Sequence, residues 1–384
     1  MPSSGKKQKI LPGIQYLRGI CALMVVFSHA AGLMGYAEYF GSSPADLANL
    51  GKFGVSVFFA ISGYIIVLVS LDERLQPTVS LSKYARRRVL RILPFFWLCV
   101  IGYNALTFLG TGTVEWLAAL KTLVVWPSGE LKPNVAWSLR HEFLFYILFA
   151  CAFLAGKRRS VILYAWFAAP LLFYGAVAAF APELPQSHPG FYEYAKNILG
   201  GSEGGANLQF ALGFLFGWLW LRGHLGALRA GPVQLLVASV AVGAIFQALG
   251  DFSGLFRIIA TTALAAIPMV VALKIGEQRG WLHKLGMELG DASFSIYLVH
   301  NAALLIMLKA ASPFSNVIPQ LVFLPVSIVG ATLAGIVVHR LVEAPLINFL
   351  MRRPPQATAA LATQDEPHDR PHDREVRRIP RSTP

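Results

Sequence analysis

The sequence predicts an all-α integral membrane protein, a polytopic bundle of about ten transmembrane helices with both termini in the cytoplasm. The 384 residues are 55% hydrophobic and 14% charged, and their mean hydropathy is +0.55. Soluble domains carry roughly 25% charged residues. The apolar residues also form long blocks close to the roughly 20 residues that a helix needs to cross the hydrocarbon core. Because backbone polar groups in lipid must be paired within their own segment, each block is predicted to be a helix.

Ten apolar segments account for these blocks, and the distribution of charge gives their orientation. Lys and Arg gather in alternate connections, which are therefore predicted to be cytoplasmic. The expected organisation is a cytoplasmic N-terminal segment 1–13, a transmembrane domain 14–350 and a disordered cytoplasmic tail 351–384. The predicted spans are residues 14–35, 51–71, 92–110, 139–156, 160–181, 207–222, 232–250, 254–275, 292–311 and 320–341.

Two connections on the outer side carry further structure. Residues 114–126 read as an amphipathic helix at the membrane interface, with Trp116 and Trp126 as anchors. Residues 182–206 are rich in Pro and Gly and are expected to cover an external opening.

Charge and cysteine usage exclude other classes of protein. The net charge of +13 lies in short loops beside apolar spans, without a basic domain or aromatic platform, so no nucleic-acid partner is predicted. The three cysteines lie inside apolar blocks at unrelated spacings, which indicates core packing. The tail histidines His368 and His372 have no further ligands spaced for a closed site, so no metal is predicted.

The first span contains two polar residues, Arg18 and His29. They are eleven positions apart, so they share one helical face and lie about 16 Å apart along the axis. Charges inside membrane helices are costly and mark functional sites. Arg18 either extends to lipid phosphates or belongs to a site. His29, in the outer half, is the side chain suited to proton transfer near neutral pH.

Basic residues also precede the third span. Arg88-x-x-Arg91 places two guanidinium groups on one helical face, where they suit bidentate phosphate binding. Positive charge at a cytoplasmic boundary is the alternative explanation.

The fourth span begins with an intramembrane acid, Glu142. Arg140 or His141 could neutralise it, or it could orient His29 as an acid–base partner. In the ninth span, Tyr297 and His300 share a face and suit either interhelical hydrogen bonds or a site. Two further contacts are predicted. Ser62 and Gly63 are expected to allow close helix packing, and Glu343 is expected to pair with His339 or Arg340.

Taken in order, these motifs resemble the acyltransferase-3 family of membrane-bound O-acyltransferases over roughly residues 10–350. One departure is Ser56, where many relatives carry an acidic residue. The matching motifs are Arg18-x10-His29, Gly54-Val-x-Val-Phe-Phe-x-Ile-Ser-Gly63-Tyr64, Arg88-x-x-Arg91-Ile-x-Pro94, Trp137-Ser-Leu-x-x-Glu142-x-x-Phe-Tyr146, Ser293-x-Ser-Ile-Tyr297-Leu-x-His300 and Val342-Glu343-x-Pro345.

The resemblance implies transfer of an acyl group, commonly acetyl, from cytosolic acyl-coenzyme A to a hydroxyl of a saccharide or lipid-linked saccharide, in a bacterial inner membrane. It implies no bound cofactor; acyl-coenzyme A is a co-substrate. His29 and Glu142 are then the expected catalytic residues. Arg18, Arg88 and Arg91 are the expected donor-binding residues. The expected site-lining residues are Tyr64, Trp137, Ser138, Tyr146, Tyr297 and His300.

A secondary transporter or flippase is the alternative reading, in which the same buried Arg, His and Glu form a substrate or proton pathway. Such transporters often show inverted repeats and broken helices. The sequence has no convincing internal repeat, which favours the enzyme.

Overall fold

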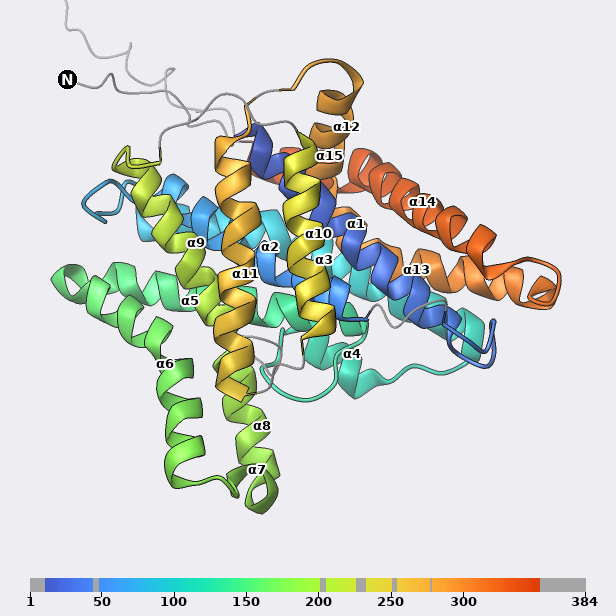
Figure 1. Cartoon of the computed structure of the whole chain (residues 1–384), viewed down its shortest axis with the longest axis horizontal. Helices are drawn as coiled ribbons and strands as arrows, with labels where there is room; N and C mark the ends of the chain where they lie inside the picture. The colour runs from blue at the N-terminus through green and yellow to red at the C-terminus, as the bar shows by residue number, and fades with distance from the viewer. Residues whose placement is uncertain are drawn as a thin grey trace, which may run out of the picture.

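A computed structural model describes residues 11–43, 48–200, 205–225, 233–250, 254–276 and 278–352 of the chain. These residues form helices and connections without a β-strand, so the predicted all-α class is confirmed (Figure 1). The tail with His368 and His372 lies outside the described residues. The longer helices are α1 (Pro12–Met34), α2 (Ala48–Ser70), α3 (Leu81–Thr111), α5 (Trp137–Leu154), α6 (Arg159–Phe180), α9 (Ala206–Leu221), α10 (Val233–Leu249), α11 (Gly254–Lys274), α13 (Ser293–Ala311) and α14 (Gln320–Val338).

Each of the ten predicted spans falls on one of these helices. In the described part of the chain, eight helices are long and apolar enough to cross a membrane, and α9 and α10 are apolar but shorter. Large apolar side chains such as Leu109, Phe180 and Leu321 are exposed on the surface, as expected where helices face lipid tails. The count of ten crossings and the cytoplasmic position of both termini stay predictions.

The third helix is longer than predicted. It begins at Leu81, because the Ser80 side chain caps it by accepting a hydrogen bond from the Lys83 amide at 3.3 Å. The predicted span began at residue 92 because the basic residues before it are too polar for a membrane span, although they can form a helix. Arg88 and Arg91 therefore lie within α3 itself.

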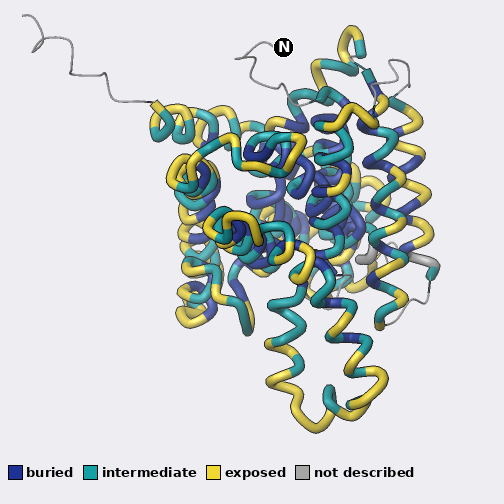
Figure 2. Tube along the Cα trace, turned by 90° about the vertical axis from the view of Figure 1, so that its left-hand side faces the viewer, coloured by how far each residue is buried: buried dark blue, intermediate teal, exposed yellow. Residues whose placement is uncertain are grey.

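Helices α1 and α2 lie at the centre of the bundle. Of the apolar window of α2, 72% is buried, compared with 17% for the corresponding window of α6. In Figure 2 the buried residues gather in the central part of the molecule. The segment α6, α7 (Leu184–Ser187) and α8 (Pro189–Ile198) projects from it and is largely exposed (Figures 1 and 2). The two central helices carry Arg18, His29 and Ser62.

Close packing of α2 against α9 depends on glycine, as the sequence predicted for Gly63. A Cβ on Gly63 would lie 2.3 Å from the Phe210 carbonyl oxygen. A Cβ on Gly213 of α9 would lie 1.8 Å from the Ala60 carbonyl oxygen. Since no side chain fits at these points, the two backbones approach closely, as small residues allow in membrane bundles.

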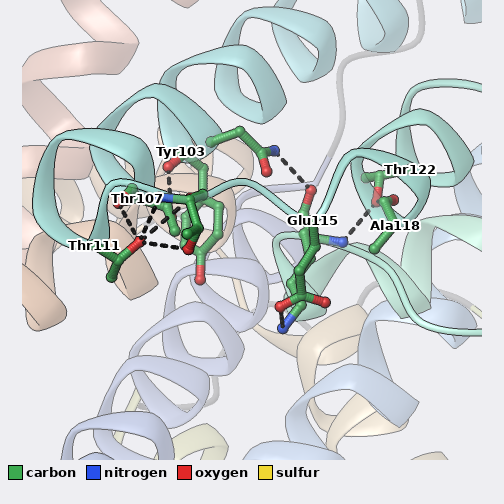
Figure 3. A network of polar contacts seen from close by, with 9 residues as sticks. Tyr103, Thr107, Thr111, Glu115, Ala118 and Thr122 are labelled. Carbon is green, nitrogen blue, oxygen red and sulfur yellow. Dashed lines mark hydrogen bonds and ion pairs between the residues drawn. The ribbon is translucent and has the colours of Figure 1, made fainter.

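The connection between α3 and α5 contains the predicted amphipathic helix, α4 (Trp116–Leu123), and a polar network (Figure 3). The buried Thr122 hydroxyl accepts from the Lys132 amide at 2.7 Å and donates to the Ala118 carbonyl at 2.8 Å. The Lys132 ammonium pairs with Glu115 at 2.8 Å, and this hydrogen bond raises the pKa of Lys132. These contacts fix the loop that precedes α5.

A π-helical turn, His339–Glu343, follows α14 and leads into α15 (Ala344–Met351), the last described helix. Glu343 is buried, accepts a hydrogen bond from Ser295 of α13 at 2.6 Å and pairs with His339 at 2.8 Å. The predicted pairing of Glu343 with His339 is thus confirmed. Arg340 instead pairs with Glu288 of α12 (Gly280–Asp291) at 2.7 Å, which lowers the pKa of Glu288.

Candidate active site

Predicted site residues from four helices line one cavity of about 120 Å³, called here the arginine cavity. Its charged lining residues are three arginines and one carboxylate, a balance that suits a polyanionic ligand. Ser62 of α2 also lines this cavity. The predicted site residues that meet here are Arg18 of α1, Arg88 and Arg91 of α3, Ser138, Glu142 and Tyr146 of α5, and Tyr297 of α13.

Two of the arginines, Arg18 and Arg88, are held by polar and aromatic neighbours. Arg18 donates to the Gln15 side chain at 2.8 Å, and Gln15 in turn donates to Asp291 at 2.7 Å. The Arg88 guanidinium lies 5.3 Å from the Tyr146 ring centroid and 5.8 Å from that of Tyr84. Such cation–π contacts hold the group in place without neutralising it. These cations therefore stay available for phosphate groups.

Glu142 lies in the arginine cavity, and its partners are hydroxyl groups. Ser62 donates to the Glu142 carboxylate at 3.0 Å, and Tyr146, one helical turn further along α5, donates a very short hydrogen bond to it. Neither Arg140 nor His141 pairs with Glu142 within the part of the chain that the structure describes, so the predicted neutralisation is wrong. Residues 140 and 142 point about 200° apart around a helix, which explains the separation.

Helix α5 therefore presents two different faces. Ser138, Glu142 and Tyr146, spaced four residues apart, line the arginine cavity. Trp137, Arg140 and His141 line a second cavity of about 500 Å³ that also contains His29, and it is called here the histidine cavity. The topology predicted from loop charge places the arginine cavity toward the cytoplasm and the histidine cavity toward the outer face.

The expected pairing of His29 with Glu142 is not made. His29 lines the histidine cavity, and its ring neighbour is the fully buried His300 of α13, at a centroid distance of 5.0 Å. His300 Nε2 lies 3.3 Å from His29 Nδ1. The residue that contacts His29 is thus the predicted site residue His300 rather than Glu142.

The hydrogen bonds of this pair assign the tautomers of both rings. His300 Nδ1 lies 3.0 Å from the Ile296 carbonyl oxygen, which can only accept, so the proton is on Nδ1 and Nε2 is an acceptor. His29 Nδ1 faces that acceptor and the Val25 carbonyl oxygen at 3.0 Å, so it also carries the proton. The remaining nitrogen of His29, Nε2, then carries the lone pair that a general base or nucleophile requires.

A shared wall separates the two cavities. Val55 and Tyr297 line both of them. The Tyr297 hydroxyl donates to the Val135 carbonyl at 2.9 Å and accepts from Ser138 at 2.7 Å. A fixed hydroxyl pair therefore lies at the junction between the arginines and the cavity of His29.

Tyr64 and His300 are the predicted site residues that line neither cavity, although His300 contacts His29. Tyr64 is fully buried and packs in the core formed with Ile61 and Phe216. Ser62, rather than Tyr64, lines the arginine cavity, because residues two apart on a helix point in nearly opposite directions. Sequence reasoning missed Lys52, Asn134 and Asn197 of the histidine cavity, since polar residues near loop ends give no distinct signal. It also assigned Ser62 to packing alone.

Comparison with known proteins identifies the family of the chain. The acyltransferase domain of the acyltransferase-3 family matches residues 11–340. The exopolysaccharide production protein ExoZ of Rhizobium meliloti (strain 1021) is 31% identical over 328 residues, covering 82% of this chain and 94% of that protein. The acyltransferase MdmB of Streptomyces mycarofaciens is 25% identical over 389 residues, covering 93% of this chain and 96% of that protein. No solved structure gives a significant match.

The long apolar helices define a multi-pass membrane protein, and its two cavities carry the Arg, Glu and His side chains described above. The chain belongs to the acyltransferase-3 family and is an acyltransferase.

Proposed function

We propose that this enzyme moves an acyl group, most simply acetyl, from cytosolic acyl-coenzyme A to a hydroxyl of a cell-envelope or exported saccharide, and that it works in a bacterial inner membrane. The observation that carries the proposal is the contact of the two cavities at Val55 and Tyr297. The donor and the acceptor can then approach from opposite faces and meet at that wall. Similarity to an exopolysaccharide production protein supports the saccharide acceptor.

In this proposal the donor's phosphates bind Arg18, Arg88 and Arg91. Guanidinium groups suit phosphate oxygens because they donate in a planar fork. The acyl arm extends past Glu142 toward Tyr297, both of which line the arginine cavity. Glu142, held by Ser62 and Tyr146, fixes the geometry of the cavity rather than the orientation of His29.

His29 acts through Nε2. As a general base it takes the proton of the acceptor hydroxyl while the oxygen attacks the thioester carbonyl carbon. The carbon–sulfur bond breaks, and the coenzyme A thiolate leaves with the proton that His29 returns. The second route is nucleophilic attack by Nε2 on the thioester carbonyl carbon: the carbon–sulfur bond breaks, and the coenzyme A thiolate leaves with the Nδ1 proton of the ring. The resulting acyl-imidazole then passes its acyl group to the acceptor hydroxyl, whose proton returns to His29.

The test is transfer of label from acetyl-coenzyme A to envelope glycans in membranes that contain the wild type or His29→Ala. We expect label only with the wild type, at equal protein levels in the membrane. Full labelling by His29→Ala would overturn the role of His29. Label retained on the protein when acceptor is withheld would identify the acyl-imidazole route, and its absence the general-base route.

A further inference from the structure

The histidine cavity contains the guanidinium group of Arg140. None of its lining residues in the described part of the chain is Asp or Glu. The cavity is large enough for part of a saccharide, since small-molecule sites usually enclose about 300–1,000 Å³.

Arg140 is the cation that packing holds most tightly. It is only 5% exposed, yet among the described residues its one hydrogen bond runs from Nη2 to the Gly129 carbonyl oxygen at 2.7 Å. Its Nε–H has no partner there, and the guanidinium has no ion pair. A buried charge without a counter-ion is costly, and an anionic ligand would relieve that cost.

His141 lies next to Arg140 and adds a second incompletely paired group. It is 3% exposed, and its Nδ1 has no partner among the described residues, although the imidazole makes a hydrogen bond with the Asn197 backbone. The Trp137 and Phe59 rings pack against it at centroid distances of 6.0 and 6.2 Å. The rings hold His141 beside Arg140. Because one ring nitrogen bonds the Asn197 backbone, Nδ1 of the neutral imidazole is an acceptor suited to a saccharide hydroxyl, and Arg140 supplies the donors of this wall.

A second hollow adjoins the histidine cavity, and its carboxylates favour the Arg140 side of the histidine cavity for an anion. That hollow shares His29 and Asn134 with the histidine cavity but contains Glu38 and Glu130 together with Lys132. An anionic group is therefore repelled by the carboxylate-bearing side and attracted to the Arg140 side. Bound there, it would share the cavity with His29.

We infer that Arg140 is the anchor of an acceptor site that recognises a negative group, a carboxylate or a phosphate, on the saccharide. The inference rests on the proposed function, because it takes the ligand of the histidine cavity to be the acceptor. A uronic acid within the glycan and a phosphate linking the sugar to a lipid are the two sources of such a charge.

The test is binding of three probes to the purified full-length protein in lipid nanodiscs by titration calorimetry. The probes are methyl glucuronide, glucose 1-phosphate and the neutral methyl glucoside. A charged hydrogen bond supports a difference of about ten-fold or more, so we expect at least one anionic probe to bind that much more tightly than the glucoside. The anion that binds more tightly identifies the source of the charge.

Arg140→Gln should remove the preference for the anionic probe, and Arg140→Lys should keep only part of it because the planar fork is lost. Lys309→Gln is the matched control: Lys309 also donates to a glycine carbonyl, that of Gly110, but it does not line the histidine cavity. Equal binding of all probes to the wild type, no binding of either anion, or an unchanged preference in Arg140→Gln would overturn the inference.

The two proposals fail in different ways. Label transfer from acetyl-coenzyme A without any anion preference would refute the anionic acceptor site alone. Arg140-dependent binding of an anion, without transfer from any acyl-coenzyme A, would refute the proposed function and leave the anion site standing.

Discussion

Replacing Gly213 by alanine should damage both the stability and the activity of the enzyme, although Gly213 lines neither cavity. The new Cβ would lie 1.8 Å from the Ala60 carbonyl oxygen and 2.8 Å from the Tyr64 amide nitrogen. To bring the first separation to 3.0 Å, α2 and α9 must move apart locally by about 1.2 Å. Overpacking of this kind typically costs about 1–3 kcal/mol, and here the obstructing atom is backbone, which cannot turn away.

The displacement should reach the site through Ser62. Ser62 lies between Ala60 and Tyr64 on α2 and donates to Glu142 at 3.0 Å, so a shift of α2 lengthens that hydrogen bond. A misplacement of about 1 Å can lower a rate by about 100-fold. The assays are thermal unfolding of the purified protein in detergent and label transfer from acetyl-coenzyme A in membranes.

Gly175→Ala is the control, since a Cβ on Gly175 of α6 meets nothing within 4 Å. It should leave both readouts unchanged. If Gly213→Ala unfolds at the same temperature as Gly175→Ala and transfers label at the same rate, then the close approach of α2 and α9 does not support the site as described.

Three further substitutions test the polar contacts. Thr122→Val leaves a backbone amide of the outer loop without its acceptor, at a cost of about 1–3 kcal/mol, so limited proteolysis should cut residues 112–136 faster; an unchanged cleavage rate would contradict the role of that hydroxyl. Glu343→Ala removes the buried partner of two side chains and should destabilise the protein by about 3 kcal/mol or more, whereas Arg340→Gln breaks an exposed pair and should hardly change the unfolding temperature. His300→Phe removes the acceptor that orients His29 and should slow transfer by about ten-fold or more, while His300→Gln, which keeps an acceptor, should retain more activity; equal rates for the two variants would refute the tautomer assignment.

Several features of the fold could be predicted because they depend on local sequence. The apolar segments predicted the helices, since a segment in lipid must pair its own backbone groups whatever its neighbours are. Gly63 predicted close packing, because that inference needs only residue size. Glu343 predicted a pair with His339 or Arg340, because these residues lie within one helical turn of it, and the structure shows the pair with His339. The start of α3 at Leu81 was not predicted, because its first turns are basic and hydropathy identifies only the apolar part of a helix.

The site was predictable in its residue types but not in its pairings. Arg18 and Glu142 stood out because charges are rare in apolar segments, and Arg88 and Arg91 stood out because their spacing places them on one helical face. The bundle brings all four to one cavity. His29 was correctly singled out as a polar residue in an apolar helix, but the residue that contacts it is His300. That contact joins α1 to α13, helices far apart in the sequence, and their relative rotation follows from packing alone.

The sequence by itself determined that this protein is a membrane bundle and which polar residues its helices carry, because transfer of each segment into lipid is a local free energy. Only the tertiary structure decided that Ser138, Glu142 and Tyr146 face one cavity while Arg140 and His141 face another, and that Val55 and Tyr297 lie between the two. The physical reason is that helical periodicity fixes which residues share a face, whereas interhelical packing decides what each face meets.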